Sequence, residues 1–242
     1  MRREILIALV LSVALAIAIL SLPDVLIPVA QSMLKAMGLY WPAAIFLIGV
    51  IHGLKPDEHT WPITVSYGIM QRSKKGALLT TSVFAAALTL VWSSLSALTS
   101  ELLSFFRSYN VDPLVDIVVG LTMMGVASVL MLQGKGESRD EEGADYRVVW
   151  IHGVAAAFGG DFVIVLLLTV ALGNLMETNL GFAIGLLFGL GSWIAQSLVV
   201  LLIYSGLIRQ VRDFGIMVRA GRISLLLLGT FMIGLGVYSY LY

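Results

Sequence analysis

Two histidines, two carboxylates and a lysine lie within eight residues of an otherwise apolar region. The stretch reads Ile51-His52-Gly53-Leu54-Lys55-Pro56-Asp57-Glu58-His59-Thr60. Ionisable side chains are costly inside a bilayer, and where they occur they mark ion or substrate pathways. Imidazole and carboxylate groups together suit divalent ions of nickel, cobalt, zinc, iron or manganese. We therefore expect His52, Asp57, His59 and Glu58 to bind a metal ion, with Lys55 binding substrate or acting as a gate.

A weaker copy of this stretch follows a hundred residues later. It consists of Trp150-Ile151-His152-Gly153 and then Gly159-Gly160-Asp161. His152 is the third and last histidine of the chain. We expect His152 and Asp161 to complete the metal site from the second half of the chain. The alternative interpretation is a polar contact between the two halves that binds no metal.

The spacing of the first two histidines requires a break in the helix that carries them. On a straight helix, His52 and His59 would lie about 10.5 Å apart along the axis. Bonds from a metal to imidazole nitrogen are only about 2.0–2.1 Å long, so one ion could not bind both. Gly53 and Pro56 supply the break, because glycine permits unusual dihedrals and proline removes a backbone donor. Gly159 and Gly160 are the corresponding break in the second half.

The composition is that of an all-helical integral membrane protein. The 242 residues are 59% hydrophobic and only 12% charged, whereas soluble domains average about 25% charged residues. Several apolar runs approach the ~20 residues of a helical span, without the alternation of barrel strands. The chain has no cysteine, which excludes disulfides, thiolate metal sites and dithiol electron transfer. The formal net charge is zero and predicts no nucleic-acid partner.

The apolar runs predict one polytopic transmembrane domain over residues 1–242, with about seven spans. An extra N-terminal span at 1–22 is longer than the apolar core of a signal peptide, about 7–15 residues, so we expect it to be retained. The first group of three spans occupies 40–133 and the second occupies 148–242. The individual spans are predicted at 5–22, 40–71, 77–98, 113–133, 148–172, 180–208 and 223–242, with residues 24–38 at the interface.

The two groups of three spans predict a 3+3 inverted repeat with broken helices. An odd number of spans per group gives the groups opposite orientations, and in such transporters the site lies at the midplane, where broken helices meet. Placing the N-terminus in the cytoplasm puts twelve of the 15 lysines and arginines on the cytoplasmic side. The positive-inside rule therefore predicts a multi-pass protein of the cell membrane with a cytoplasmic N-terminus and an external C-terminus.

The segment from His52 to His59 resembles the His-x4-Asp-His signature of the nickel/cobalt transporter (NicO/NiCoT) family, with one extra residue, Glu58, before the last histidine. Phe158-Gly159-Gly160-Asp161 is similar to a later glycine-and-aspartate motif of that family. The resemblance implies a metal-selecting signature in an early span. The wider lysine-exporter superfamily, which includes the cytochrome c biogenesis membrane protein, is similar in its inverted plan. Electron transfer by that protein needs paired cysteines, which this chain lacks.

We expect a transporter of divalent transition-metal cations, nickel or cobalt first, and not an enzyme. The metal is the substrate, and no organic cofactor is expected. One alternative is an exporter of a small organic or oxyanion solute held by histidines, Lys55 and helix N-termini. Another is an intramembrane metalloenzyme, although no His-Glu-x-x-His sequence occurs. The expected partners are the lipid bilayer and the metal ion; the sequence leaves open a homo-oligomer, an accessory protein and the direction of transport.

Overall fold

The secondary structure of the described part of the chain is helical throughout, joined by short turns. A computed structural model describes residues 2–21, 40–56, 60–98, 112–133, 145–158, 165, 168–169, 180–210 and 214–241. These residues form eight named helices and no strand. The helices are α1 (Arg2–Ser21), α3 (Trp41–Leu54), α4 (Trp61–Ile69), α5 (Lys74–Ser96), α7 (Asp112–Gln133), α8 (Tyr146–Ala156), α10 (Gly181–Gln210) and α11 (Phe214–Leu241).

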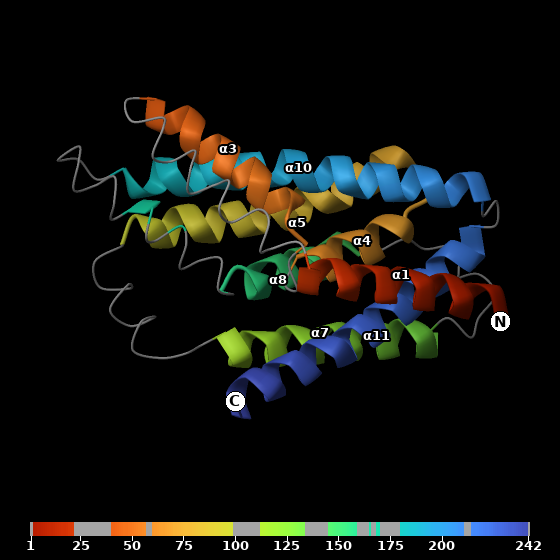
Figure 1. Ribbon diagram of the computed structural model, residues 1–242. Helices are drawn as coiled ribbons and strands as arrows, with labels where there is room; N and C mark the ends of the chain where they lie inside the picture. The colour runs from red at the N-terminus through yellow and green to blue at the C-terminus, as the bar shows by residue number, and fades with distance from the viewer. Residues whose placement is uncertain are drawn as a thin grey trace.

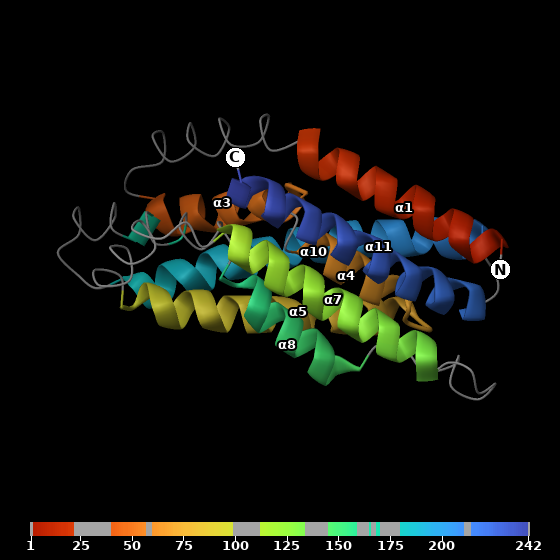
Figure 2. The same ribbon diagram turned by 90° about the horizontal axis from the view of Figure 1, so that it is seen from below.

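The longer helices run along one common direction and form an elongated bundle (Figures 1 and 2). In both views α1, α5 and α11 begin at the same end of the bundle, where α7 and α10 finish. The C-terminus lies at the opposite end. Successive long helices of each half therefore run in alternating directions.

Among the residues that the structure describes, three helices are long and apolar enough to cross a membrane. They are the segments Lys74–Ser96, Gly181–Leu207 and Gly215–Leu241, that is, α5 and most of α10 and α11. Two shorter apolar segments, Trp41–Leu54 and Asp116–Leu132, belong to α3 and α7. A 23-residue helix such as α5 is about 35 Å long, which exceeds a hydrocarbon core of about 30 Å. The helix lengths thus agree with a membrane protein.

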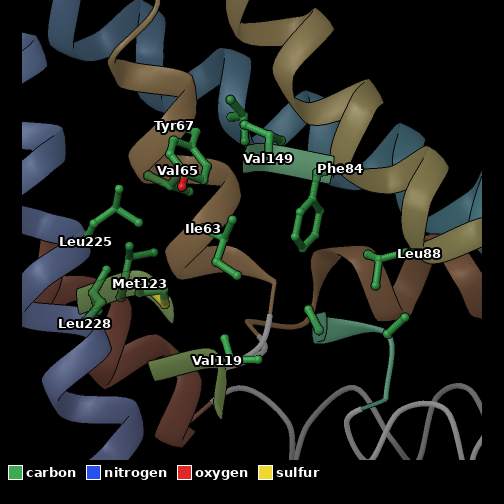
Figure 3. Packing of buried hydrophobic residues seen from close by; sticks show 14 of the residues in the cluster. Ile63, Val65, Tyr67, Phe84, Leu88, Val119, Met123, Val149, Leu225 and Leu228 are labelled. Carbon is green, nitrogen blue, oxygen red and sulfur yellow. The ribbon is translucent and has the colours of Figure 1, made fainter. Parts of the chain in front are cut away.

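The short helix α4 lies in the middle of the bundle. Every residue from Pro62 to Ile69 is buried, and the polar ones have partners: the Thr64 hydroxyl donates to the Thr60 carbonyl at 2.9 Å and the Ser66 hydroxyl to the Ser224 hydroxyl at 3.3 Å. It contacts α1, α5, α8, α10 and α11. Figure 3 shows Ile63 and Val65 of α4 among buried side chains of other helices, such as Leu225 and Met123. This nine-residue helix is too short to span a bilayer, and it is held by its neighbours on every side.

Glycines set the closest approach of α10 to α5. A β-carbon added at Gly185 would lie 2.6 Å from the Ser93 Cα. One added at Gly181 would meet Ser96, and one added at Gly189 would meet Thr89. The four-residue spacing of these glycines predicts helix packing, and this prediction is confirmed. At Gly181 and Gly185 the two helices therefore pack backbone against backbone, and at Gly189 the Thr89 side chain of α5 packs against the backbone of α10.

The pair α7 and α11 is packed through a second set of glycines. A β-carbon added at Gly120 would lie 2.6 Å from the Gly229 carbonyl oxygen, and one added at Gly229 would lie 2.8 Å from the Gly120 carbonyl oxygen. Each glycine opens a Gly-x-x-Met-x-Gly sequence, at 120–125 and at 229–234. The methionine of each motif is fully buried. The two motifs therefore occupy reciprocal places in one interface.

Helix α11 begins at Phe214, earlier than the predicted start at residue 223. Arg219 and Arg222, which the sequence places in a cytoplasmic loop, lie within this helix. The Arg219 Nε lies 3.5 Å from Glu4 Oε1 on α1, and Arg222 is buried. Charged residues in a sequence usually indicate the end of a span. An arginine can nevertheless lie within the helix when its aliphatic part packs against apolar surface and its charged group has a partner.

Candidate functional site

The predicted 40–71 segment is interrupted where the ionisable residues gather. Helix α3 ends at Leu54, and α4 begins at Trp61 with a proline in its first turn. Lys55 is extended, with φ −65° and ψ 122°, and its N–H donates to the carbonyls of Ile51 at 2.9 Å and His52 at 3.0 Å. The Trp61 Nε1 donates to the Gly53 carbonyl at 3.3 Å. The break thus follows directly after Leu54, and the Trp61 side chain bridges it.

His52 is enclosed by aromatic rings at the end of α3. Its side chain is buried, with the Phe188 ring centroid 4.9 Å away and the Trp92 centroid 5.8 Å away. Trp92 and Phe188 also meet edge to face at 5.3 Å. The Trp92 Nε1 donates to the Ala157 carbonyl, just beyond α8, at 2.9 Å. His52 is therefore linked through one indole to the end of the helix that carries His152.

His152 is buried on α8 and has one hydrogen-bond partner in α4. Its relative exposure is 1%. The imidazole Nδ1 and the Tyr67 hydroxyl oxygen lie 2.8 Å apart and share a hydrogen bond. The two rings stack, with centroids 5.6 Å apart. Within the described part of the chain, Nε2 of His152 has no hydrogen-bond partner.

The glycine that follows each histidine packs against a helix of the other half of the chain. A β-carbon added at Gly53 would lie 2.8 Å from the Ser192 Cα and 2.9 Å from the Ala195 Cβ. One added at Gly153 would lie 2.7 Å from the Phe84 carbonyl oxygen and 2.8 Å from the Ala87 Cβ. Each glycine therefore packs against the backbone of one residue of its partner helix and against the side chain of the alanine three positions after that residue. The glycines bring both histidines into the interior between the two halves.

Only some of the predicted site residues can be placed. His52 and His152 are buried, Lys55 is half-buried, and Gly53 and Pro56 are buried at the break. Among the residues that the structure describes, no group of three or more histidine and carboxylate side chains could hold a metal ion. The remaining predicted residues lie outside the described part of the chain: Asp57, Glu58, His59, Gly159, Gly160 and Asp161.

Sequence reasoning missed Tyr67, Trp92 and Gln196. All three are buried, and Gln196 lies one turn after Ser192, to which its Nε2 donates at 3.1 Å. A tyrosine or tryptophan in an apolar helix carries no local signal of a polar role. The only clue is that a buried hydroxyl or indole N–H needs a partner, and the partner comes from distant sequence.

Comparison with known proteins gives no match to any family model, any curated protein or any solved structure. The chemistry of the residues must therefore carry the functional interpretation. Two buried imidazoles can offer nitrogen ligands to a cation. The helix that carries His52 ends two residues after it, at Leu54.

Proposed function

We propose that this chain is a multi-pass membrane transporter of divalent transition-metal cations, with nickel or cobalt as the first candidates. The observation that carries the proposal is the matched placing of His52 and His152. Each is buried near the end of a helix that stops within a few residues, and each precedes a glycine packed against the opposite half. Burying an ionisable side chain such as histidine at membrane depth costs free energy, so its presence there indicates a functional site.

The helix contacts support the proposed 3+3 inverted repeat of seven spans. In that plan α3, α5 and α7 correspond to α8, α10 and α11. Helix α3 packs on α10 as α8 packs on α5, through Gly53 and Gly153 respectively. The reciprocal pair Gly120 and Gly229 joins α7 to α11. A two-fold relation between the halves would account for all of these contacts, and in such a plan the site would lie between the two broken helices.

The proposed orientation has the N-terminus in the cytoplasm and the C-terminus outside. The end of the bundle where α1 and α5 begin (Figure 1) carries the exposed cations of the turn before and at the start of α5. They are Arg72, Lys74 and Lys75. Helix α1 presents a row of exposed apolar residues, including Leu6, Val10 and Ile17, which suits contact with lipid. A basic end and an apolar flank are the features of an inserted protein with that end inside.

A cation is the substrate that best suits this set of groups. His52 and His152 would contribute nitrogen, and Asp57, His59 and Asp161 would contribute oxygen and nitrogen from their stretches of sequence. Borderline divalent ions prefer this mixture of imidazole and carboxylate. The resemblance of the His52–His59 segment to the nickel/cobalt transporter signature favours those two metals. Lys55 would lie near the site as a gating charge.

The proposal can be tested by metal uptake and by equilibrium binding. Cells that produce equal amounts of each variant would be given radioactive nickel or cobalt, and purified protein would be titrated with the same metals. We expect His52→Ala and His59→Ala to abolish binding and uptake. His152→Ala should weaken both, and Asp161→Asn should impair uptake because a ligand charge is lost. Thr230→Ala, an exposed change on α11, is the control.

The outcomes separate the candidate functions. Normal uptake by all four site variants would refute metal transport and favour an exporter of an organic or oxyanion solute. Normal uptake by His152→Ala and Asp161→Asn alone would confine the site to the first half. Metal-dependent hydrolysis of a peptide or lipid by the purified wild-type protein would instead indicate a metalloenzyme.

A further inference from the structure

The Tyr67–His152 pair joins the two halves of the chain through a buried polar contact. Tyr67 belongs to α4, the half-helix after the first break, and His152 belongs to α8 of the second half. Both side chains are about 1% exposed, and they lie 85 positions apart in sequence. Figure 3 labels Tyr67 and also Val149, which lies one turn before His152 on α8; both belong to the buried cluster. The pair is therefore shielded from solvent and fixed by packing.

The geometry leaves one imidazole nitrogen for a ligand. Nδ1 is engaged by the Tyr67 hydroxyl at 2.8 Å, while Nε2 has no hydrogen-bond partner among the described residues. The Thr122 carbonyl of α7 comes near the imidazole without forming a hydrogen bond to Nε2. A buried polar atom without a partner costs about 1–3 kcal/mol. A cation bound at Nε2 would give this atom a partner.

A phenolic hydroxyl suits this position because it can both donate and accept. When the hydroxyl donates to Nδ1, the neutral imidazole carries its proton on Nε2. When the hydroxyl accepts from Nδ1–H, Nε2 presents a lone pair, which is the form that binds a metal. The Tyr67 hydroxyl can therefore form a hydrogen bond with Nδ1 in either tautomer of His152. Phenylalanine at position 67 would keep the ring stacking but could form neither hydrogen bond.

We infer that Tyr67 is a positioning residue for the cation site: it holds His152 so that Nε2 is the nitrogen that binds the metal. The inference rests on the proposed function and adds to it a residue of the first half that controls a ligand of the second. When a histidine binds a metal through one ring nitrogen, its other ring nitrogen is hydrogen-bonded to a group that fixes the orientation of the ring. Loss of that group lowers metal affinity about 10–100-fold. Tyr67 does not contact the metal.

The experiment compares Tyr67→Phe with Tyr204→Phe. Tyr204 is also fully buried, and its hydroxyl donates to one main-chain carbonyl, that of Gln71, at 3.0 Å. Both changes remove one buried hydroxyl and one hydrogen bond, so both should lower the thermal stability to a similar extent. Cobalt would be titrated into the purified proteins, with the affinity and the visible ligand-field spectrum of bound cobalt as readouts.

We expect Tyr67→Phe to weaken cobalt binding about 10–100-fold and to change the ligand-field spectrum, while Tyr204→Phe alters neither. In the His152→Ala background, Tyr67→Phe should cause no further loss of affinity, because the two residues act through one ligand. Equal effects of Tyr67→Phe and Tyr204→Phe would reduce Tyr67 to a packing residue and overturn the inference. So would additive losses in the double variant.

The same titrations separate failure of this inference from failure of the proposed function. If the wild-type protein binds neither cobalt nor nickel, metal transport and the role of Tyr67 both fall. If the wild-type protein binds cobalt and Tyr67→Phe binds it equally well, the role of Tyr67 falls and metal transport stands. If His152→Ala binds cobalt like the wild type, the site lies in the first half alone, and Tyr67 positions no ligand.

Discussion

Replacing Gly53 with alanine tests the contact that brings His52 into the interior. The new β-carbon would lie 2.8 Å from the Ser192 Cα and 2.9 Å from the Ala195 Cβ, and it would also meet the Ser192 carbonyl oxygen. Carbon atoms in favourable contact are about 3.5–4.0 Å apart. The obstructing atoms belong to the backbone or to a β-carbon, so no side chain can rotate away. Helices α3 and α10 must therefore separate by roughly 0.7 Å or more.

Gly53→Ala should lower the free energy of unfolding, because the added methyl group overpacks the contact between α3 and α10. Inserting a methyl group into a well-packed interface costs about 1–3 kcal/mol. Alanine also favours a helix over glycine by about 1 kcal/mol, which partly offsets that loss. Gly125→Ala on α7 isolates this second contribution, because a β-carbon there meets nothing within 4 Å. The difference between the two variants should thus be about 1–3 kcal/mol.

Thermal unfolding in detergent, followed by intrinsic tryptophan fluorescence, would measure the effect. A difference of about 2 kcal/mol corresponds to about 4–8 °C in Tm for a chain of this size. Gly153→Ala should fall between the two variants. Its β-carbon would lie 2.7 Å from the Phe84 carbonyl oxygen and 2.8 Å from the Ala87 Cβ, but 3.4 Å from the Phe84 Cα, so it obstructs less backbone than the β-carbon at Gly53. If Gly53→Ala is as stable as Gly125→Ala, the close packing of α3 on α10 is not what holds His52 in place.

Two further predictions concern the link between the histidine-bearing helices and the orientation of the chain. Trp92→Phe should lower the free energy of unfolding by about 1–3 kcal/mol, because the buried Ala157 carbonyl loses its indole donor at 2.9 Å; unchanged stability in thermal unfolding would contradict this. A cysteine introduced at Ser138 should react with an impermeant thiol reagent only in inverted vesicles or opened cells. Labelling of intact cells would reverse the proposed orientation.

Several features of the fold follow from local sequence because they depend on neighbouring residues only. The predicted segments 113–133 and 180–208 coincide closely with α7 and α10, since long apolar runs bounded by polar residues favour helices. The end of α3 at Leu54 lies between Gly53 and Pro56, where the backbone chemistry of both residues disfavours a continuous helix. The glycine spacing in α10 likewise predicts a close helix contact without identifying the partner.

The sequence by itself determined a helical, apolar chain with a break beside His52, because composition, apolar length and backbone stereochemistry are local properties. The tertiary structure decided which residues meet: Tyr67 with His152, Trp92 with Ala157, and the glycine motif of α7 with that of α11. It also decided that α11 includes Arg219, which pairs with Glu4 on α1. These contacts join residues far apart in the chain, and only the packing of whole helices brings them within hydrogen-bonding or van der Waals distance.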